Sequence, residues 1–211
     1  MRRLIVILVL AVGLWSGYWF AGSSAVQQGI EGWFADQTAR GMTAERTALV
    51  VQGYPNRFDL RVEGLRLADP QTGFGWQTPF AEVYSMTWKP WHIIAALAPE
   101  QVITTPDEEV ILRADGLKAS LRASPTLDLP LAAVIVESGA FTATSDAGWT
   151  VAGVRAAVSL KAVAEVATEA GEPSVAEDDN RYIMVLDLAE LAPDPVEMAR
   201  ITAGSDLPPV I

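Results

Sequence analysis

The stretch RFDLRVEGLRL, residues 57–67, decides the fold. Charged and apolar side chains alternate from Arg57 to Glu63, so an extended chain here would have one charged face and one apolar face. Gly64 interrupts this alternation, and Leu65 and Leu67 resume it with the apolar parity shifted by one residue. A β-bulge or a tight bend shifts parity in this way. The stretch therefore predicts a half-buried β-strand that bends.

The same period of two recurs along the chain. It covers residues 80–88, 110–121, 154–166 and 182–188, whereas residues 131–136 are apolar on both faces. A turn is predicted at residues 69–73. A glycine followed by an apolar residue opens several of these runs, at Gly64, Gly116, Gly139 and Gly153. The irregular spacing is not that of a formal repeat, but it favours hairpin-connected antiparallel strands. We expect a mainly β fold, an extended antiparallel sheet shaped like a half-barrel or groove, with one or two short helices, one of them starting near Asp194.

An apolar run precedes the sheet, at residues 4–21, and Arg2 and Arg3 come before it. A helix of this length covers roughly 27 Å, close to the thickness of a bilayer core of about 30 Å. The arginines predict a cytoplasmic N-terminus, and aromatic residues at the far end suit the outer interface. A cleaved signal peptide, with Ser23 and Ala25 near the cut, is the alternative. We expect a single-pass inner-membrane protein whose bulk lies in the periplasm.

A short amphipathic helix is predicted between the anchor and the sheet. Val26, Ile30, Trp33 and Phe34 fall on one helical stripe, which either packs on the following domain or lies along the outer leaflet. The sequence thus divides into a cytoplasmic tip (1–3), a transmembrane anchor (4–21), a juxtamembrane helix (22–42) and an extracytoplasmic β-rich domain (43–211). The apolar end of the chain, at residues 207–211, suggests that the natural protein continues.

Composition narrows the function. The net charge of −11 argues against binding to nucleic acid, whose phosphates an acidic surface repels. The chain has no cysteine and one histidine, His92, so the usual zinc ligand sets and cysteine nucleophiles are absent. Neither a Gly-rich phosphate loop nor a serine nucleophile elbow is present. We expect a non-enzymatic protein with no cofactor and no metal; a hydrolase with paired carboxylates is an alternative that sequence does not test.

One segment carries an unusual cluster of residues, GYPNRFDL at residues 53–60. Tyr54-Pro55 favours an extended turn, and Arg57 and Asp59 share a strand face, where they could pair with each other or across strands. The segment is either a structural corner that fixes the first hairpin or a ligand site. Trp33, Tyr54, Arg57, Phe58 and Asp59 are therefore the candidate residues for facing a ligand or a partner.

With the Asp69-Pro70 turn and the later Pro90-Trp91-His92 element, this signature resembles the bacterial envelope family of domain of unknown function 2125. The resemblance covers roughly residues 4–121, and it implies a membrane segment followed by an envelope domain. The architecture is also similar to that of AsmA-like envelope proteins, whose sheets present an apolar groove to lipid, although no residues match. Two functions follow as expectations: a module that handles lipid or another apolar ligand beside the bilayer, or a scaffold that holds envelope proteins.

Overall fold

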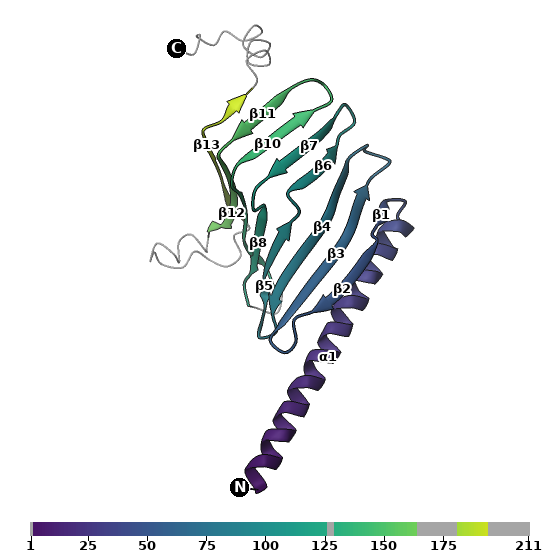
Figure 1. Cartoon of the computed structure of the whole chain (residues 1–211), viewed down its shortest axis with the longest axis vertical. Coiled ribbons are helices and arrows are strands. Elements are labelled where there is room, and N and C mark those ends of the chain that lie inside the picture. Colours follow the sequence, from purple (N-terminus) through teal and green to yellow (C-terminus); the bar gives the residue numbers. More distant parts are fainter. Residues whose placement is uncertain (1, 126–128, 164–180, 194–211) are drawn as a thin grey trace.

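The computed structural model of the chain describes residues 2–125, 129–163 and 181–193. Within them lie one long helix, α1 (Arg2–Ala39), and fourteen strands (Figure 1). The strands are β1 (Thr43–Glu45), β2 (Ala48–Gln52), β3 (Arg57–Ala68), β4 (Gly75–Met86), β5 (Lys89–Leu97), β6 (Glu100–Thr104), β7 (Glu109–Ala114), β8 (Lys118–Ala123), β9 (Leu131–Ser138), β10 (Phe141–Ser145), β11 (Thr150–Gly153), β12 (Arg155–Ala162), β13 (Tyr182–Ala189) and β14 (Ala192–Pro193).

Helix α1 joins the two helical segments that the sequence predicts separately. It runs without a break for 38 residues, about 57 Å at 1.5 Å per residue. Its first part, Leu4–Leu14, is exposed and contacts little of the sheet, and it is long and apolar enough to cross a membrane. Its second part packs on the sheet and buries Trp19, Ser23 and Phe34. The apolar run and the part of the helix that packs on the sheet therefore belong to one continuous helix.

All strands belong to one antiparallel sheet. Strand β4 is long enough to pair with β3 along one edge and, along the other, with β5 at one end and β6 at the opposite end. From β4 the sheet continues as two arms, β5-β8-β9-β12-β13 and β6-β7-β10-β11-β14. Strands at the same position in the two arms are consecutive in sequence: β5 and β6, β7 and β8, β9 and β10, β11 and β12, β13 and β14. The sheet is therefore a meander of long strands, each bent near its middle.

The bends form a line across the sheet, and hydrogen bonds connect neighbouring bends. Gly139 N–H donates to Asp115 O at 2.8 Å, and Ala114 N–H donates to Pro99 O at 2.8 Å. Gly64 and Gly116, with φ of 57° and 58°, adopt the left-handed conformation that glycine tolerates best. The glycine signature of the sequence thus marks bends within strands, and the hairpin turns lie elsewhere. Each bend adds one residue to its strand, and this extra residue shifts the parity of the apolar positions.

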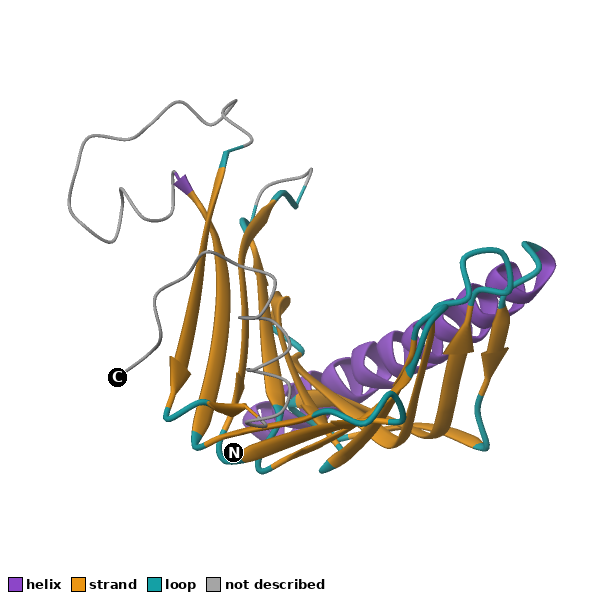
Figure 2. Cartoon of the chain, turned by 90° about the horizontal axis from the view of Figure 1, so that it is seen from above, coloured by secondary structure: helices purple, strands orange, loops and turns teal. Residues whose placement is uncertain are grey.

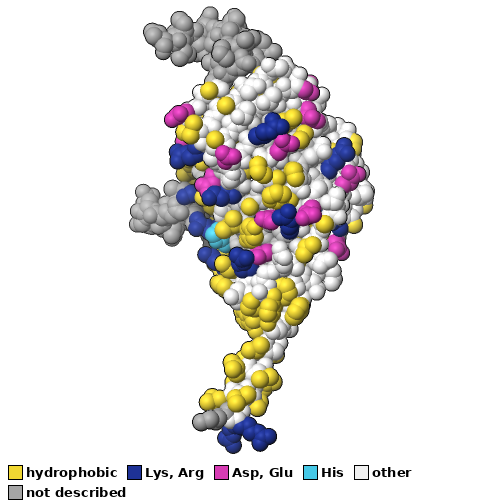
Figure 3. All heavy atoms as spheres, viewed as in Figure 1, with side chains coloured by type: hydrophobic (Ala, Val, Ile, Leu, Met, Phe, Trp, Pro, Cys, Tyr) yellow, Lys and Arg dark blue, Asp and Glu magenta, His cyan; other side chains and the backbone are white. Residues whose placement is uncertain are grey.

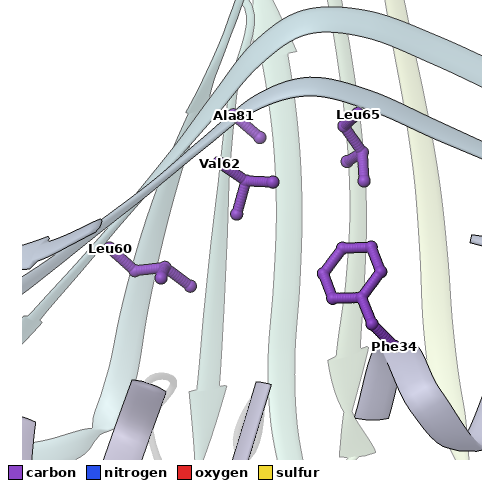
Figure 4. Packing of buried hydrophobic residues seen from close by; sticks show 5 residues of the cluster. All are labelled: Phe34, Leu60, Val62, Leu65 and Ala81. Atoms are coloured by element: carbon purple, nitrogen blue, oxygen red, sulfur yellow. The ribbon is translucent and has the colours of Figure 1, made fainter. Parts of the chain in front are cut away.

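The sheet is open and curved. Figure 2 shows it as a trough, with α1 on the concave side. We call the side on which α1 lies the inner face. Phe34 of α1 packs there against Leu60, Val62, Leu65 and Ala81, which form the buried core (Figure 4). The predicted mainly β fold with an open, groove-like sheet is confirmed. The rest of the 154–166 run beyond Val163, the helix predicted at Asp194 and the end of the chain lie outside the described residues.

Candidate functional site

The register of the strands places apolar side chains in rows across the inner face. One row crosses seven strands, and each residue in it is the register partner of the next one on the adjacent strand. The row is Leu60, Val83, Ala95, Ala119, Val136, Val158 and Leu186. The adjacent row, two residues closer to the N-terminal part of α1, is Phe58, Ser85, Ile93, Leu121, Val134, Leu160 and Met184. Seven strands at about 4.8 Å spacing give each row a width of roughly 29 Å. Apart from Ser85, both rows are apolar, so the inner face of these seven strands is a largely apolar surface.

The outer face of the same strands is charged and mixed. Its corresponding row is Arg61, Glu82, Ala96, Lys118, Glu137, Ala157 and Asp187. Lys118 pairs with Glu137 at 2.9 Å, and Arg155 pairs with Asp187 at 2.8 Å. Among the described residues, α1 covers only one end of the inner face.

Exposure rises along the inner face with distance from α1. Leu60, beside the helix, is 8% exposed, whereas Val158 is 38% and Leu186 is 60% exposed. Met184, in the neighbouring row, is 71% exposed. Fully burying one such side chain contributes about 1.5–3 kcal/mol, so leaving several of them in water is costly. We call this apolar surface the trough surface (Val136, Val158, Leu160, Met184 and Leu186).

The 53–60 segment forms the corner at which α1 meets the first hairpin. The Tyr54-Pro55 peptide bond is cis, and the Tyr54 ring stacks on Phe20 and meets Trp19 edge-on. Phe58 stacks on Trp19 with ring centroids 6.1 Å apart. A Cβ at Gly22 would lie 2.6 Å from the Phe58 ring, so glycine is needed for this close approach. Tyr54 and Phe58 thus contact the chain's own helix.

Arg57 and Asp59 pair with each other on the outer face. Arg57 Nη2 lies 2.7 Å from Asp59 Oδ2, and Asp59 is buried. Beside them, Arg61 bridges Glu63 and Glu82. Hydrogen bonds from the Tyr84 hydroxyl and from Arg61 lower the pKa of Glu82. The same bond to Glu82 raises the pKa of Tyr84. These ion pairs and hydrogen bonds connect the outer faces of β3 and β4 next to the corner.

Trp33 lies apart from that corner. It is 43% exposed and meets the ring of Phe34 edge-on, whereas Phe34 is 5% exposed and carries the packing on the sheet. The predicted stripe of α1 therefore contributes Ile30 and Phe34 to the core, and Trp33 stands at its margin. Of the five candidate residues, the structure groups Tyr54, Phe58, Arg57 and Asp59 at one corner and leaves Trp33 separate.

The residues that the structure describes contain no group of three or more His, Asp or Glu side chains that could hold a metal ion. His92 Nε2 lies 3.1 Å from Ser120 Oγ on the outer face. The aromatic cluster of Trp15, Tyr18 and Trp19, which the sequence assigns to the outer interface, donates hydrogen bonds to backbone carbonyls of the corner. The aromatic clustering is the sequence signal for these residues, but it does not indicate that they contact the sheet.

Comparison with known proteins gives one match. The family model described as "Uncharacterized protein conserved in bacteria (DUF2125)" matches residues 19–211, and so includes the second part of α1 and the whole sheet. No curated protein and no solved structure matches. The architectural similarity to AsmA-like proteins therefore stays a prediction. The chain belongs to the DUF2125 family of uncharacterized bacterial proteins.

Proposed function

We propose that this protein is a non-enzymatic module of the bacterial envelope, held in the inner membrane by α1, whose trough surface holds acyl chains of phospholipid in the periplasm. The observation that carries the proposal is the paired row from Leu60 to Leu186, which is apolar at every position. A surface without hydrogen-bonding side chains has no means of selecting a polar ligand, whereas hydrocarbon needs only contact area.

Retention of the N-terminal segment is part of this proposal. Trp19 is 6% exposed, and its indole N–H donates to Arg57 O at 2.7 Å. Cleavage near Ser23 or Ala25 would remove Trp19 and leave the ring of Phe58 without its stacking partner. A segment that forms part of the packed domain is better suited to an anchor than to a discarded signal. The two N-terminal arginines favour a periplasmic sheet.

Phospholipid is the favoured occupant because the trough begins beside the membrane segment. The row from Phe58 to Met184 lies near the end of the sheet where α1 emerges, so lipid has an apolar path from the bilayer to the exposed strands β12 and β13. The outer face, with its ion pairs, offers hydrocarbon no comparable path.

Photocrosslinking from two neighbouring positions tests this. Leu186 on the inner face and Asp187 on the outer face are both well exposed and adjacent on β13. A benzophenone amino acid at Leu186 should form phospholipid adducts in intact cells, detected by mass spectrometry of the purified chain, and the matched probe at Asp187 should form far fewer. Equal labelling at the two positions, or none at either, would contradict the proposal.

A scaffold function is the second candidate, and the β13 edge favours it. Among the described residues β13 pairs only with β12, and side chains on both of its faces are apolar and exposed, such as Val185 at 53% and Leu186 at 60%. An exposed apolar edge strand invites pairing with another chain. The same two photocrosslinking probes distinguish the candidates, because a scaffold predicts protein adducts of discrete mass in place of lipid.

A further inference from the structure

The helix and the sheet together fix how deep the sheet sits in a bilayer. We define the lower rim as the turn Gly53–Asn56 with Arg57, and the turn Thr87–Trp88. Trp15 Nε1 donates to Pro55 O at 3.0 Å, and the Ser16 and Tyr54 hydroxyls are hydrogen-bonded at 2.8 Å. The rim therefore lies level with the last third of the apolar run, not above its end.

The depth follows from the helix rise. Trp15 is twelve residues from Arg3, or about 18 Å along the axis, and Trp19 is about 24 Å from it. A hydrocarbon core is about 30 Å thick. With Arg3 at its inner boundary, Trp15 and the rim turn bound to it lie below the outer boundary, and tilting the helix lowers them further. Lifting the rim clear would draw both arginines into hydrocarbon, at about 2.5–3.5 kcal/mol each at the centre.

Four backbone carbonyls of the rim have protein donors, as this depth requires. Backbone that is not helical is tolerated in hydrocarbon only where protein groups bond its polar atoms. Pro55 O accepts from Trp15, Arg57 O from Trp19 and Thr87 O from the Tyr18 hydroxyl, at 3.0, 2.7 and 3.0 Å. Asn56 O accepts from both the backbone N–H and the hydroxyl of Thr87, each at 3.1 Å. In water these carbonyls could accept hydrogen bonds from solvent, so the three aromatic donors would not be required.

The side chains around the rim suit a lipid interface. Tyr54 is 50%, Met86 41% and Trp88 56% exposed. Next to them lies a pocket of about 580 Å³, lined by Arg57, Lys89 and His92 together with Tyr84, Ser85, Met86 and Ile94. Figure 3 shows apolar side chains at the lower end of the sheet, with cationic side chains and the single histidine above them. An apolar tip with positive charge above it matches a membrane leaflet, in which the acyl chains lie below the phosphates.

We infer that the lower rim is a membrane-interface surface, seated in the outer leaflet, with Tyr54 and Trp88 among the acyl chains and Lys89 and His92 at the level of the lipid phosphates. In this arrangement α1 spans the bilayer and the lower rim of the sheet is inserted into the outer leaflet. The end of the trough next to α1 then opens inside that leaflet. This inference does not require the trough to hold lipid, because it rests on the contacts between α1 and the rim.

Site-directed spin labelling tests the depth directly, and the chain has no native cysteine to interfere. Trp88→Cys and Asn56→Cys place labels on the rim, and Gln71→Cys places a control at the opposite end of the sheet, in the turn after Asp69; all three positions are exposed. The full-length variants are labelled in vesicles of phosphatidylcholine with phosphatidylglycerol, and their relaxation by oxygen and by a water-soluble nickel chelate is compared.

Both rim labels should be relaxed more by oxygen than by nickel, as acyl-chain positions are, and the Gln71→Cys label should show the aqueous pattern. An aqueous pattern at both rim positions would overturn the inference, even if photocrosslinking from Leu186 recovered lipid. Rim labels in hydrocarbon without lipid adducts at Leu186 would support the inference and count against the lipid-binding trough. If one rim variant fails to fold, the other carries the measurement.

Discussion

Truncation of Phe34 should separate the helix from the sheet. Phe34 is 5% exposed and lies against Leu60, Val62 and Leu65, with the Arg46 guanidinium 4.3 Å from the centre of its ring. Replacing a buried phenylalanine by alanine costs about 3–5 kcal/mol, and loss of the cation–π contact adds about 0.5–1 kcal/mol. For a chain of this size that corresponds to a fall in melting temperature of roughly 7–24 °C.

The neighbouring tryptophan provides the control. Trp33 is 43% exposed, so Trp33→Ala should cost only the edge-on ring contact with Phe34, about 0.5–1.5 kcal/mol. Phe34→Leu, which keeps much of the buried volume, should fall between the two. Unfolding of the full chain in mild detergent, followed by circular dichroism, measures all three. A Phe34→Ala shift no larger than that of Trp33→Ala would refute the assignment of Phe34 as the side chain that docks the helix.

Two further predictions concern the corner. Gly22→Ala should weaken the docking of α1 by about 1–3 kcal/mol, because its methyl group would overlap the Phe58 ring, and limited proteolysis within β2–β3 should accelerate; unchanged cleavage would contradict the close approach. Because Arg61 and Tyr84 lower the pKa of Glu82 in the folded state, the network stabilises the fold above the ordinary glutamate value of 4.5, and that contribution is lost as pH falls. Urea midpoints measured from neutral to acid pH should fall less steeply for Glu82→Gln than for the native chain, whereas parallel profiles would argue against the network.

The residue pattern predicts the strands and the two faces of β3 and β4 well. Alternation is a local property, and the charged side chains of Arg61 and Glu82 are found on the outer face, opposite Val62 and Ala81 in the core. The bends at Gly64 and Gly116 could also be predicted from the shifted parity, because an extra residue in a strand must change which face its side chains meet. The signature at 53–60 stands out in the sequence, but its contacts cannot be predicted from it, because Tyr54 and Phe58 meet a helix more than thirty residues earlier in the chain.

The sequence alone determined an apolar helix with arginines at its start, an acidic β-rich domain after it, and strands with one apolar face. Those properties depend on residues close together in the chain, where period and charge are read directly. The tertiary structure alone decided that the apolar faces of seven strands join in one row, that α1 covers only one end of it, and that the lower rim lies beside Trp15. Register between strands and the docking of a helix depend on contacts between distant residues, and no local pattern encodes which of them meet.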